Sequence, residues 1–190
     1  MHLLTDKELV KLYLNGKENA LGELLIRHKQ RIYTAIYLFV KNDALAEDIF
    51  QDTFVKVIES LRRGKYSEEG KFFPWVMRIS HNLCIDHYRK KKRTPMVNNS
   101  DTYDIFNLLK FADVNGEDMM IRDQTRDKVR SLIDQLPAEQ KEVVILRHYA
   151  ELSFKEISKM TGVSINTALG RMRYALINMR KTIEEKQIVI

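Results

Sequence analysis

Residues that interrupt helices are scarce in this sequence, and their scarcity limits the folds open to it. The 190 residues include only seven Gly and three Pro. So few helix breakers favour long helices over a sheet with many turns. With 44% hydrophobic residues the chain can bury a core, and its length suits one large domain or two small ones. We therefore expect an all-α protein.

Charge divides the chain into three blocks. Residues 1–100 carry 18 Lys and Arg against 12 Asp and Glu, residues 101–127 carry 3 against 7, and residues 128–190 carry 11 against 7. Two basic blocks therefore flank an acidic segment, which suggests two units that face nucleic acid and a connector that does not. The net charge of +6 agrees with a polyanionic partner but does not by itself identify one.

Caps and turn signals divide the expected helices between two small helical domains. The first domain is predicted over 1–95, an acidic flexible linker over 96–117, and the second domain over 118–190. A short helix near 105–111 is the one element expected inside the linker. The helices predicted for the two domains are 5–14, 19–40, 44–61, 74–93, 118–134, 138–149, 153–160 and 164–184. Thr5 and Glu8 have the spacing of a capping box at the start of the first helix.

The segment 153–176 has the pattern of a helix-turn-helix. Ser153 can cap a short helix, Gly162 can supply the positive φ of the turn, and Ser164 can cap the next helix. Helical spacing gives that second helix an apolar side: Ile165, Ala168, Met172, Ala175 and Leu176. The opposite side collects the candidates for reading DNA: Asn166, Thr167, Gly170, Arg171, Arg173 and Tyr174. A helix pair with a solvated basic face is the alternative, but the caps, short turn and arginines together favour DNA binding.

The helix expected over 44–61 has two unlike faces. The face expected to be core is apolar: Phe50, Phe54, Val57 and Leu61. The opposite face is acidic and is flanked by apolar residues: Asp48, Asp52 and Glu59, with Ile49 and Val55 beside them. Acidic side chains among apolar ones suit docking to a basic partner helix. A solvated acidic stripe explains the same spacing equally well.

Aromatic residues precede a basic run in the segment 71–93. The side chains expected to be buried are Val76, Ile79, Leu83 and His87. The candidates for contact with unpaired DNA are Phe72, Trp75, Arg78, Asn82, Asp86, Arg89 and Lys90. Aromatic rings beside cations suit stacking on bases and contact with phosphates. The alternatives are that Phe73 and Trp75 anchor the core, which we favour for Phe73, and that the basic run is solvated.

The sequence contains no motif for catalysis, metal binding or secretion. We find no P-loop, no Rossmann glycine pattern and no HExxH. Cys84 is the only cysteine, so no intrachain disulfide can form, and we expect it to be packed in the core. His81 and His87 have no obvious third ligand. The N-terminus does not resemble a signal peptide, and the longest uncharged apolar stretch, 35–40, is too short to span a bilayer. We expect a cytoplasmic protein that is not an enzyme, uses no cofactor or metal, and does not insert into membranes.

Three of these segments resemble one protein family. The run LPAEQKEVVILRHYAELSFKEISKMTGVSINTALGRMRYAL, at 136–176, is similar to region 4 of extracytoplasmic-function sigma factors of the sigma-70 family. It departs from the family at Leu169 and Gly170, where many relatives carry Lys or Arg and then Ser. The run AEDIFQDTFVKV, at 46–57, resembles region 2.2 of the same family, and the segment 71–93 resembles regions 2.3 and 2.4. The sigma regions between 2 and 4 are missing, which fits the short subclass.

The resemblance implies a fold and a function. The fold is a region 2-like bundle and a region 4-like helix-turn-helix domain joined by a flexible linker, and the function is to direct core RNA polymerase to promoters. The first domain would open DNA at the −10 element, and the second would read the −35 element and meet the polymerase flap. The residues implied in docking to the clamp helices of the polymerase large subunit are Asp48, Gln51, Asp52 and Val55. An anti-sigma factor is a further implied partner.

Two other functions stay open from the sequence. One is a stand-alone helix-turn-helix regulator whose first domain is a sensor or a dimeriser, although no heptad pattern for dimerisation is present. The other is a helical adaptor whose basic faces bind a protein or an RNA. Salt-dependent binding to promoter duplex would separate the adaptor from the sigma factor.

Overall fold

The computed structural model describes residues 4–67, 71–93 and 128–188. Over these residues the regular structure is helical and no strand occurs, as the scarcity of helix breakers predicts. The chain divides into two compact units, residues 1–101 and 102–190, and each is described by itself. The predicted linker and its short helix lie outside the described residues. None of the described helices is long and apolar enough to span a membrane.

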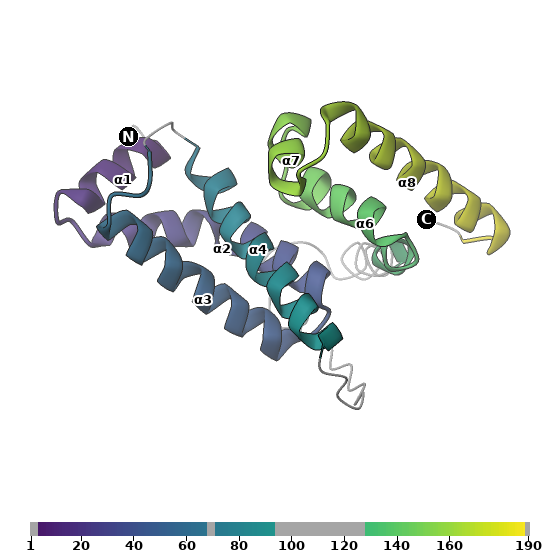
Figure 1. Ribbon diagram of the computed structural model, residues 1–190, viewed down its shortest axis with the longest axis horizontal. Coiled ribbons are helices and arrows are strands. Elements are labelled where there is room, and N and C mark those ends of the chain that lie inside the picture. Colours follow the sequence, from purple (N-terminus) through teal and green to yellow (C-terminus); the bar gives the residue numbers. More distant parts are fainter. Residues whose placement is uncertain (1–3, 68–70, 94–127, 189–190) are drawn as a thin grey trace, which may run out of the picture. The chain divides into compact units, whose positions relative to one another are not determined.

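Over its described residues, the first unit is a bundle of four helices (Figure 1). These are α1 (Asp6–Leu14), α2 (Asn19–Val40), α3 (Asp43–Arg62) and α4 (Phe72–Arg93). α2 packs against each of the other three, and α3 also packs against α4. The predicted apolar face of α3 is part of the core between the helices. The core residues of α2, α3 and α4 include Leu24, Ile32, Ile36, Leu38, Phe50, Phe54, Val57, Leu61, Phe73, Val76 and Met77. α2 is therefore the central element of this unit.

Side-chain caps set where these helices begin. The predicted capping box is present at α1, where the Glu8 carboxylate accepts a hydrogen bond from the Thr5 N–H at 2.7 Å and the Thr5 hydroxyl accepts one from the Glu8 N–H at 3.3 Å. The Asn42 side chain caps α3 by accepting a hydrogen bond from the Leu45 N–H at 2.8 Å. α4 begins at Phe72, two residues before the predicted start at Pro74, because proline is tolerated throughout the first helical turn.

A polar cluster fixes α1 on α2. Asp6 pairs with Arg27 at 2.7 Å and with the Nε2 atom of His28, also at 2.7 Å. The His28 ring is buried, and its centre lies 5.1 Å from the centre of the Phe73 ring. Burial lowers the pKa of His28 below 6.5 even though the Asp6 carboxylate acts in the opposite direction. The neutral form of His28 is therefore the form that this core favours.

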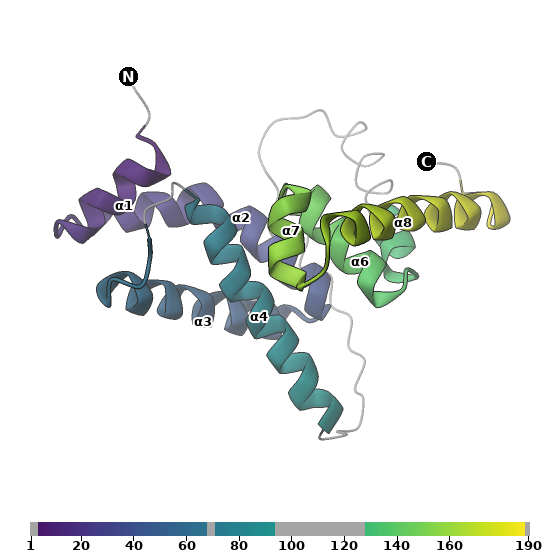
Figure 2. The same cartoon turned by 45° about the horizontal axis from the view of Figure 1, so that its top comes forward.

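The second unit is built around one long helix. It comprises the helical residues 128–134, then α6 (Ala138–Val144), the π-helical turn η2 (Ile145–Tyr149), α7 (Phe154–Thr161) and α8 (Ile165–Glu185). The predicted helix 138–149 is thus an α-helix that widens into a π turn. α6 and α7 both pack on α8 (Figure 2). The core is aliphatic: Leu132, Ile133, Leu136, Val143, Val144, Ile145, Leu146, Leu152, Ile157, Ala168 and Ala175.

Candidate functional site

Hydrogen bonds fix the turn between α7 and α8 as its sequence predicts. Gly162 adopts φ 71°, the left-handed conformation that ends α7. The Ser164 hydroxyl accepts a hydrogen bond from the Thr167 N–H at 3.0 Å and caps α8. Across the turn, the Ser158 hydroxyl donates to the Val163 carbonyl at 2.6 Å. These bonds fix the direction in which α8 leaves α7, so the exposed face of α8 has a defined position on the unit.

The packed face of α8 is narrower than predicted. Ala168 and Ala175 are fully buried and Met172 is half-buried, whereas Ile165 is 44% exposed and Leu176 is 43% exposed. The prediction that these last two side chains face the core is wrong. With about 100° of turn per residue, they lie roughly 60° and 80° to one side of Ala168. The small alanines seat α8 on a narrow strip, and the flanking apolar residues stay in solvent.

Most of the predicted DNA-reading residues are exposed on α8. The four exposed side chains are Asn166, Thr167, Arg173 and Tyr174. Arg171 is less exposed than these four. It is half-buried at the edge of the packed face, and its guanidinium lies 3.9 Å from the Glu142 carboxylate of α6. This position corrects the prediction that Arg171 lies on the outer face. Gly170 borders open space, since a Cβ atom there would meet nothing within 4 Å.

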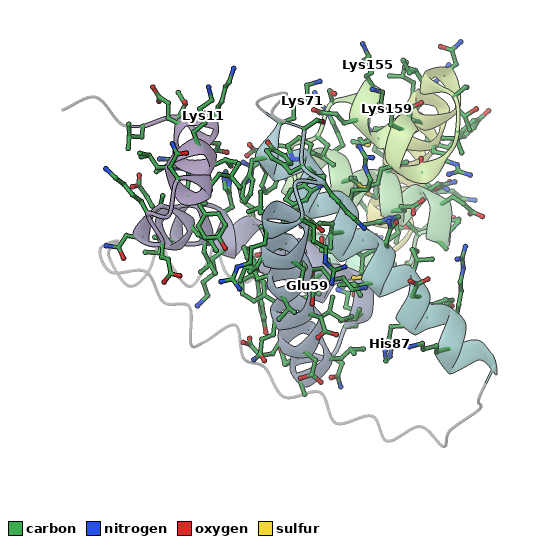
Figure 3. The ribbon with its side chains drawn as sticks, turned by 60° about the vertical axis from the view of Figure 1, so that its left-hand side comes forward. Lys11, Glu59, Lys71, His87, Lys155 and Lys159 are labelled. Atoms are coloured by element: carbon green, nitrogen blue, oxygen red, sulfur yellow. The ribbon has the colours of Figure 1, made fainter. Side chains whose placement is uncertain are left out.

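The sequence pattern missed three exposed residues of the helix-turn-helix. Lys155 and Lys159 extend from α7 one turn apart (Figure 3). The first helix of such a motif crosses the DNA backbone, so cations there face phosphates. The spacing of four residues between Lys155 and Lys159, about one helical turn, is the sequence signal that could have identified them. Leu169 is 44% exposed on α8, between Asn166 and Arg173.

α3 presents its acidic side to solvent. The exposed residues include the predicted docking set: Asp48, Gln51, Asp52 and Val55. Val55 is 54% exposed, which is high for a large aliphatic side chain. Ile49 lines the same groove as Asp48 and Asp52 beside the acidic face, but it is buried, so Val55 is the exposed apolar side chain of the two. Glu59 extends from the same helix (Figure 3).

The buried face of α4 is rotated relative to the prediction. Val76 is buried as expected, but Ile79, Leu83 and His87 are only half-buried. The side chains that α4 buries after Val76 are Met77, Ser80, His81 and Cys84. The two phenylalanines at the start of the helix both enter the core, and this turns the rest of α4 with them.

The aromatic residues at the start of α4 have different environments. Phe72 is 1% exposed, with its ring centre 6.2 Å from Tyr66 and 6.0 Å from Trp75. This burial corrects the prediction that Phe72 contacts DNA, because a buried ring has no face for a base. Phe73 is buried in the core, as we favoured. Trp75 is half-buried, and its ring centre lies 4.6 Å from that of Tyr66 in the preceding loop.

A groove of about 600 Å³ lies between α3 and α4. It brings two predicted sets of residues together: Asp48 and Asp52 from α3, and Asp86, Arg89 and Lys90 from α4. His87 of α4, labelled in Figure 3, also lines the groove. Arg78 and Asn82 are exposed on α4 outside this groove. The predicted docking acids and the predicted strand-binding cations therefore share one surface.

The thiol of Cys84 is buried in the core of the first unit. Burial raises the pKa of Cys84 to about 12, so the thiol stays protonated and unreactive near neutral pH. This confirms the expectation that Cys84 is a packed core residue. Across residues 4–67, 71–93 and 128–188, no group of three or more His, Cys, Asp or Glu side chains could hold a metal ion.

Two family models match the chain, one over each unit. The model of sigma-70 region 2 matches residues 24–94, and the model of sigma-70 region 4 matches residues 126–173. Together they cover more than half of the chain. The chain belongs to the sigma-70 family. In this sigma factor most of α2, with α3 and α4, lies within the region 2 match, and α6, η2, α7 and the first part of α8 lie within the region 4 match.

Relatives of this sigma factor agree with the extracytoplasmic-function type that its motifs predict. The RNA polymerase sigma factor CarQ of Myxococcus xanthus is 28% identical, over 94% of this chain and 97% of its own length. The ECF RNA polymerase sigma factor SigW of Bacillus subtilis is 25% identical with the same coverage. The ECF RNA polymerase sigma factor SigE of Mycolicibacterium smegmatis is 30% identical, over 79% of this chain and 56% of its own length.

Two solved structures share the fold of this sigma factor. CnrH, in complex with the cytosolic domain of CnrY, matches with a TM-score of 0.67 at 22% identity, over 95% of this chain and 97% of that chain. The sigma factor RpoE of Bartonella quintana, in complex with the anti-sigma factor NepR, matches with a TM-score of 0.65 at 16% identity, over 86% and 96%. These matches confirm the predicted all-α fold of two helical domains.

Proposed function

We propose that this sigma factor directs core RNA polymerase to promoters in the cytoplasm, with a separate task for each unit. The first unit docks on the polymerase and holds DNA at the −10 element, and the second unit reads the −35 element as duplex. The observation that carries the proposal is the capped helix α8, which presents Asn166 and Arg173 on an exposed face. The sigma factor catalyses no reaction itself, and the polymerase performs the chemistry.

The exposed face of α8 suits the major groove. Arginine can bind guanine through two hydrogen bonds, and asparagine can bind adenine in the same way. Arg173 is exposed and is our candidate base reader, whereas Arg171 is directed toward Glu142 and positions α8 on α6. Thr167, Tyr174 and the backbone at Gly170 complete the surface. Lys155 and Lys159 of α7 contact phosphates and fix the register.

The acidic face of α3 is the proposed docking surface for the clamp helices of the polymerase large subunit. Asp48, Gln51 and Asp52 supply charge and hydrogen-bond acceptors, and exposed Val55 supplies apolar contact. Opposite charges across such a surface speed association and fix orientation. The groove between α3 and α4 continues this surface toward the basic end of α4.

The exposed side of α4 is the proposed contact with the opened −10 strand. Its cations and polar groups are Arg78, Asn82, Asp86, Arg89 and Lys90. Trp75 offers the half-buried ring on which an unpaired base stacks. Phe72 acts only through packing, since its ring contacts Trp75 from inside the core.

Two weak contacts on one chain together make promoter binding selective. Joining the units raises the effective concentration of the second contact once the first has formed, on promoters of matching spacing. We further propose that the second unit meets the polymerase flap and that an anti-sigma factor binds the chain, as NepR binds RpoE of Bartonella quintana.

Duplex reading is tested with Arg173→Ala in the full chain. We expect a loss of about 1–3 kcal/mol in binding to a −35 duplex, with relaxed preference at one base pair, because a two-bond contact to a base is removed. In vitro transcription of genomic DNA by core polymerase with this protein identifies a promoter. Its −35 element is then made as a duplex, and each base pair is substituted in turn. Arg180→Ala, exposed on the same helix two turns further, is the control and leaves base preference unchanged. Wild-type affinity of Arg173→Ala for every duplex would contradict this assignment.

Docking is tested with Asp52→Lys. The reversal places a cation against the basic polymerase helix, so we expect co-purification with core polymerase to fall while binding to the isolated −35 duplex is unchanged. Glu18→Lys gives the same charge change on an exposed residue that makes no side-chain cap at the start of α2, and it serves as the control. Unchanged co-purification of a folded Asp52→Lys protein would remove α3 from the docking surface.

A further inference from the structure

Leu169 is an exposed apolar side chain on the flank of α8, roughly 40° around the helix from Arg173 and 60° from Asn166. It is 44% exposed, one turn after Ile165, which is equally exposed. Asn166 and Arg173 lie on the same face within one turn of it. A single exposed leucine needs no explanation. Two adjacent exposed apolar side chains beside the two best candidates for base reading do need one.

The charge around Leu169 identifies the partner as a polyanion. Residues 165–183 contain no Asp or Glu, and the first acids of α8 are Glu184 and Glu185. Arg173 is exposed beside Leu169, and Lys155 and Lys159 are exposed on α7 (Figure 3). A helix face with cations and no acids over five turns suits duplex DNA. An apolar residue on such a face meets whatever apolar group the DNA offers.

Thymine is the base that offers such a group. In the major groove, the edges of the other bases present hydrogen-bond donors and acceptors, whereas thymine adds its 5-methyl group. Gly170 follows Leu169 and leaves open space where a side chain would stand, so the backbone can come close to the bases. A leucine has no polar atom with which to read the other edges.

We propose that Leu169, with Ile165 beside it, reads a thymine of the −35 element through the 5-methyl group. This inference rests on the proposed function, in which α8 enters the major groove. The recognition helix contacts base edges with its N-terminal residues, and both side chains lie in the first two turns of α8. Leu176 is exposed to the same degree, but it lies two turns further and has no part in this contact.

The test removes only the methyl group from the DNA. In the −35 duplex identified by transcription, each thymine is replaced singly by uracil, which keeps every hydrogen-bonding group. The full chain should lose affinity about fourfold at one position, the effect expected from one methylene-sized group of about 0.8 kcal/mol. Leu169→Ala should bind the thymine and uracil duplexes alike at that position. Leu176→Ala should keep the fourfold difference, and Leu169→Met, which conserves volume, should keep most of it.

Several results would overturn the inference. They are equal wild-type affinity for uracil at every thymine, a −35 element in which no thymine matters, and a Leu169→Ala protein that keeps the methyl dependence. If Leu169→Ala weakens polymerase binding and leaves the thymine-to-uracil ratio unchanged, Leu169 faces protein and the inference also fails. Arg173→Ala separates this failure from that of the proposed function. If it relaxes base preference while uracil has no effect, α8 still reads the duplex and only the thymine contact is wrong.

Discussion

The cores of the two units are made of different residues. In the first unit the buried side chains include the rings of Phe50, Phe54, Phe72 and Phe73, and also the polar residues His28, Thr53, Ser80 and His81. Over the described residues of the second unit, every buried hydrophobic side chain is aliphatic, and no polar or charged side chain is buried. The first unit therefore adds large aromatic rings and polar groups to its aliphatic core, whereas the second relies on aliphatic groups alone.

This difference shows two ways of holding a functional face in place. In the first unit α2, α3 and α4 are 20 to 22 residues long, and their outer faces are supported by the aromatic core beneath. In the second unit α6 and α7 have only seven and eight residues. Helices of this length are marginal by themselves. The Ser153 cap of α7, the Ser164 cap of α8 and the glycine turn therefore contribute much of what keeps α8 in position.

The largest expected effect is the loss of an aromatic ring from the first core. Phe72→Ala should lower the free energy of unfolding of the first unit by about 3–5 kcal/mol, because it removes a buried ring that Trp75 and Tyr66 pack against. Urea unfolding followed by tryptophan fluorescence measures it, since Trp75 is the single tryptophan and lies in this unit. The control is Tyr88→Ala, which removes an exposed ring from the same helix and should change stability by less than about 0.5 kcal/mol. Equal effects of the two variants would contradict the aromatic core.

A smaller effect is expected from the caps of the second unit. Ser164→Ala leaves the Thr167 N–H without its acceptor and should cost about 1 kcal/mol of stability, seen by circular dichroism during unfolding. Ser164→Gly should lower stability by only a few tenths of a kcal/mol, because glycine suits the cap position. Ser153→Ala removes the capping box of α7 and should behave like Ser164→Ala. If alanine and glycine at position 164 have the same effect, the cap does not stabilise α8.

The smallest expected effect is a pH dependence confined to the first unit. Burial lowers the pKa of His28 from 6.5, against the pull of Asp6, so the unfolded chain binds this proton more readily than the folded one. Stability contributed by neutral His28 is therefore complete above pH 6.5 and falls as the pH drops below it. Urea unfolding of the first unit on either side of this value measures the loss, and His28→Gln should reduce it. Stability that increases on acidification would have the wrong sign.

Local signals in the sequence predicted most of the fold. The caps at Thr5, Ser153 and Ser164 and the glycine turn act over three or four residues, so the sequence contains all of their partners. The apolar face of α3 followed from spacing in the same way, since Phe50, Phe54, Val57 and Leu61 are all buried. These features depend on neighbours along the chain, and a pattern can state them completely.

Features that depend on other helices could not be predicted in this way. Spacing groups residues on a face but does not say how wide a strip the neighbouring helices cover, so Ile165 and Leu176 were placed inside although they are exposed. Arg171 was placed outside because Glu142, its partner, is 29 positions away on α6. Phe72 was assigned to DNA because nothing local distinguishes an aromatic residue that binds a base from one that supports it. The roles proposed for the site residues remain predictions.

The burial of Cys84 has a practical consequence for measuring the distance between the two units. Maleimide reagents react with thiolates, whereas the Cys84 thiol is buried on the inner side of α4 and protonated near neutral pH. A cysteine introduced at an exposed site would therefore be labelled almost alone, without first removing the native one. A fluorophore placed at Tyr88 in the first unit and another at Arg180 in the second would report the distance between the units, free and on polymerase.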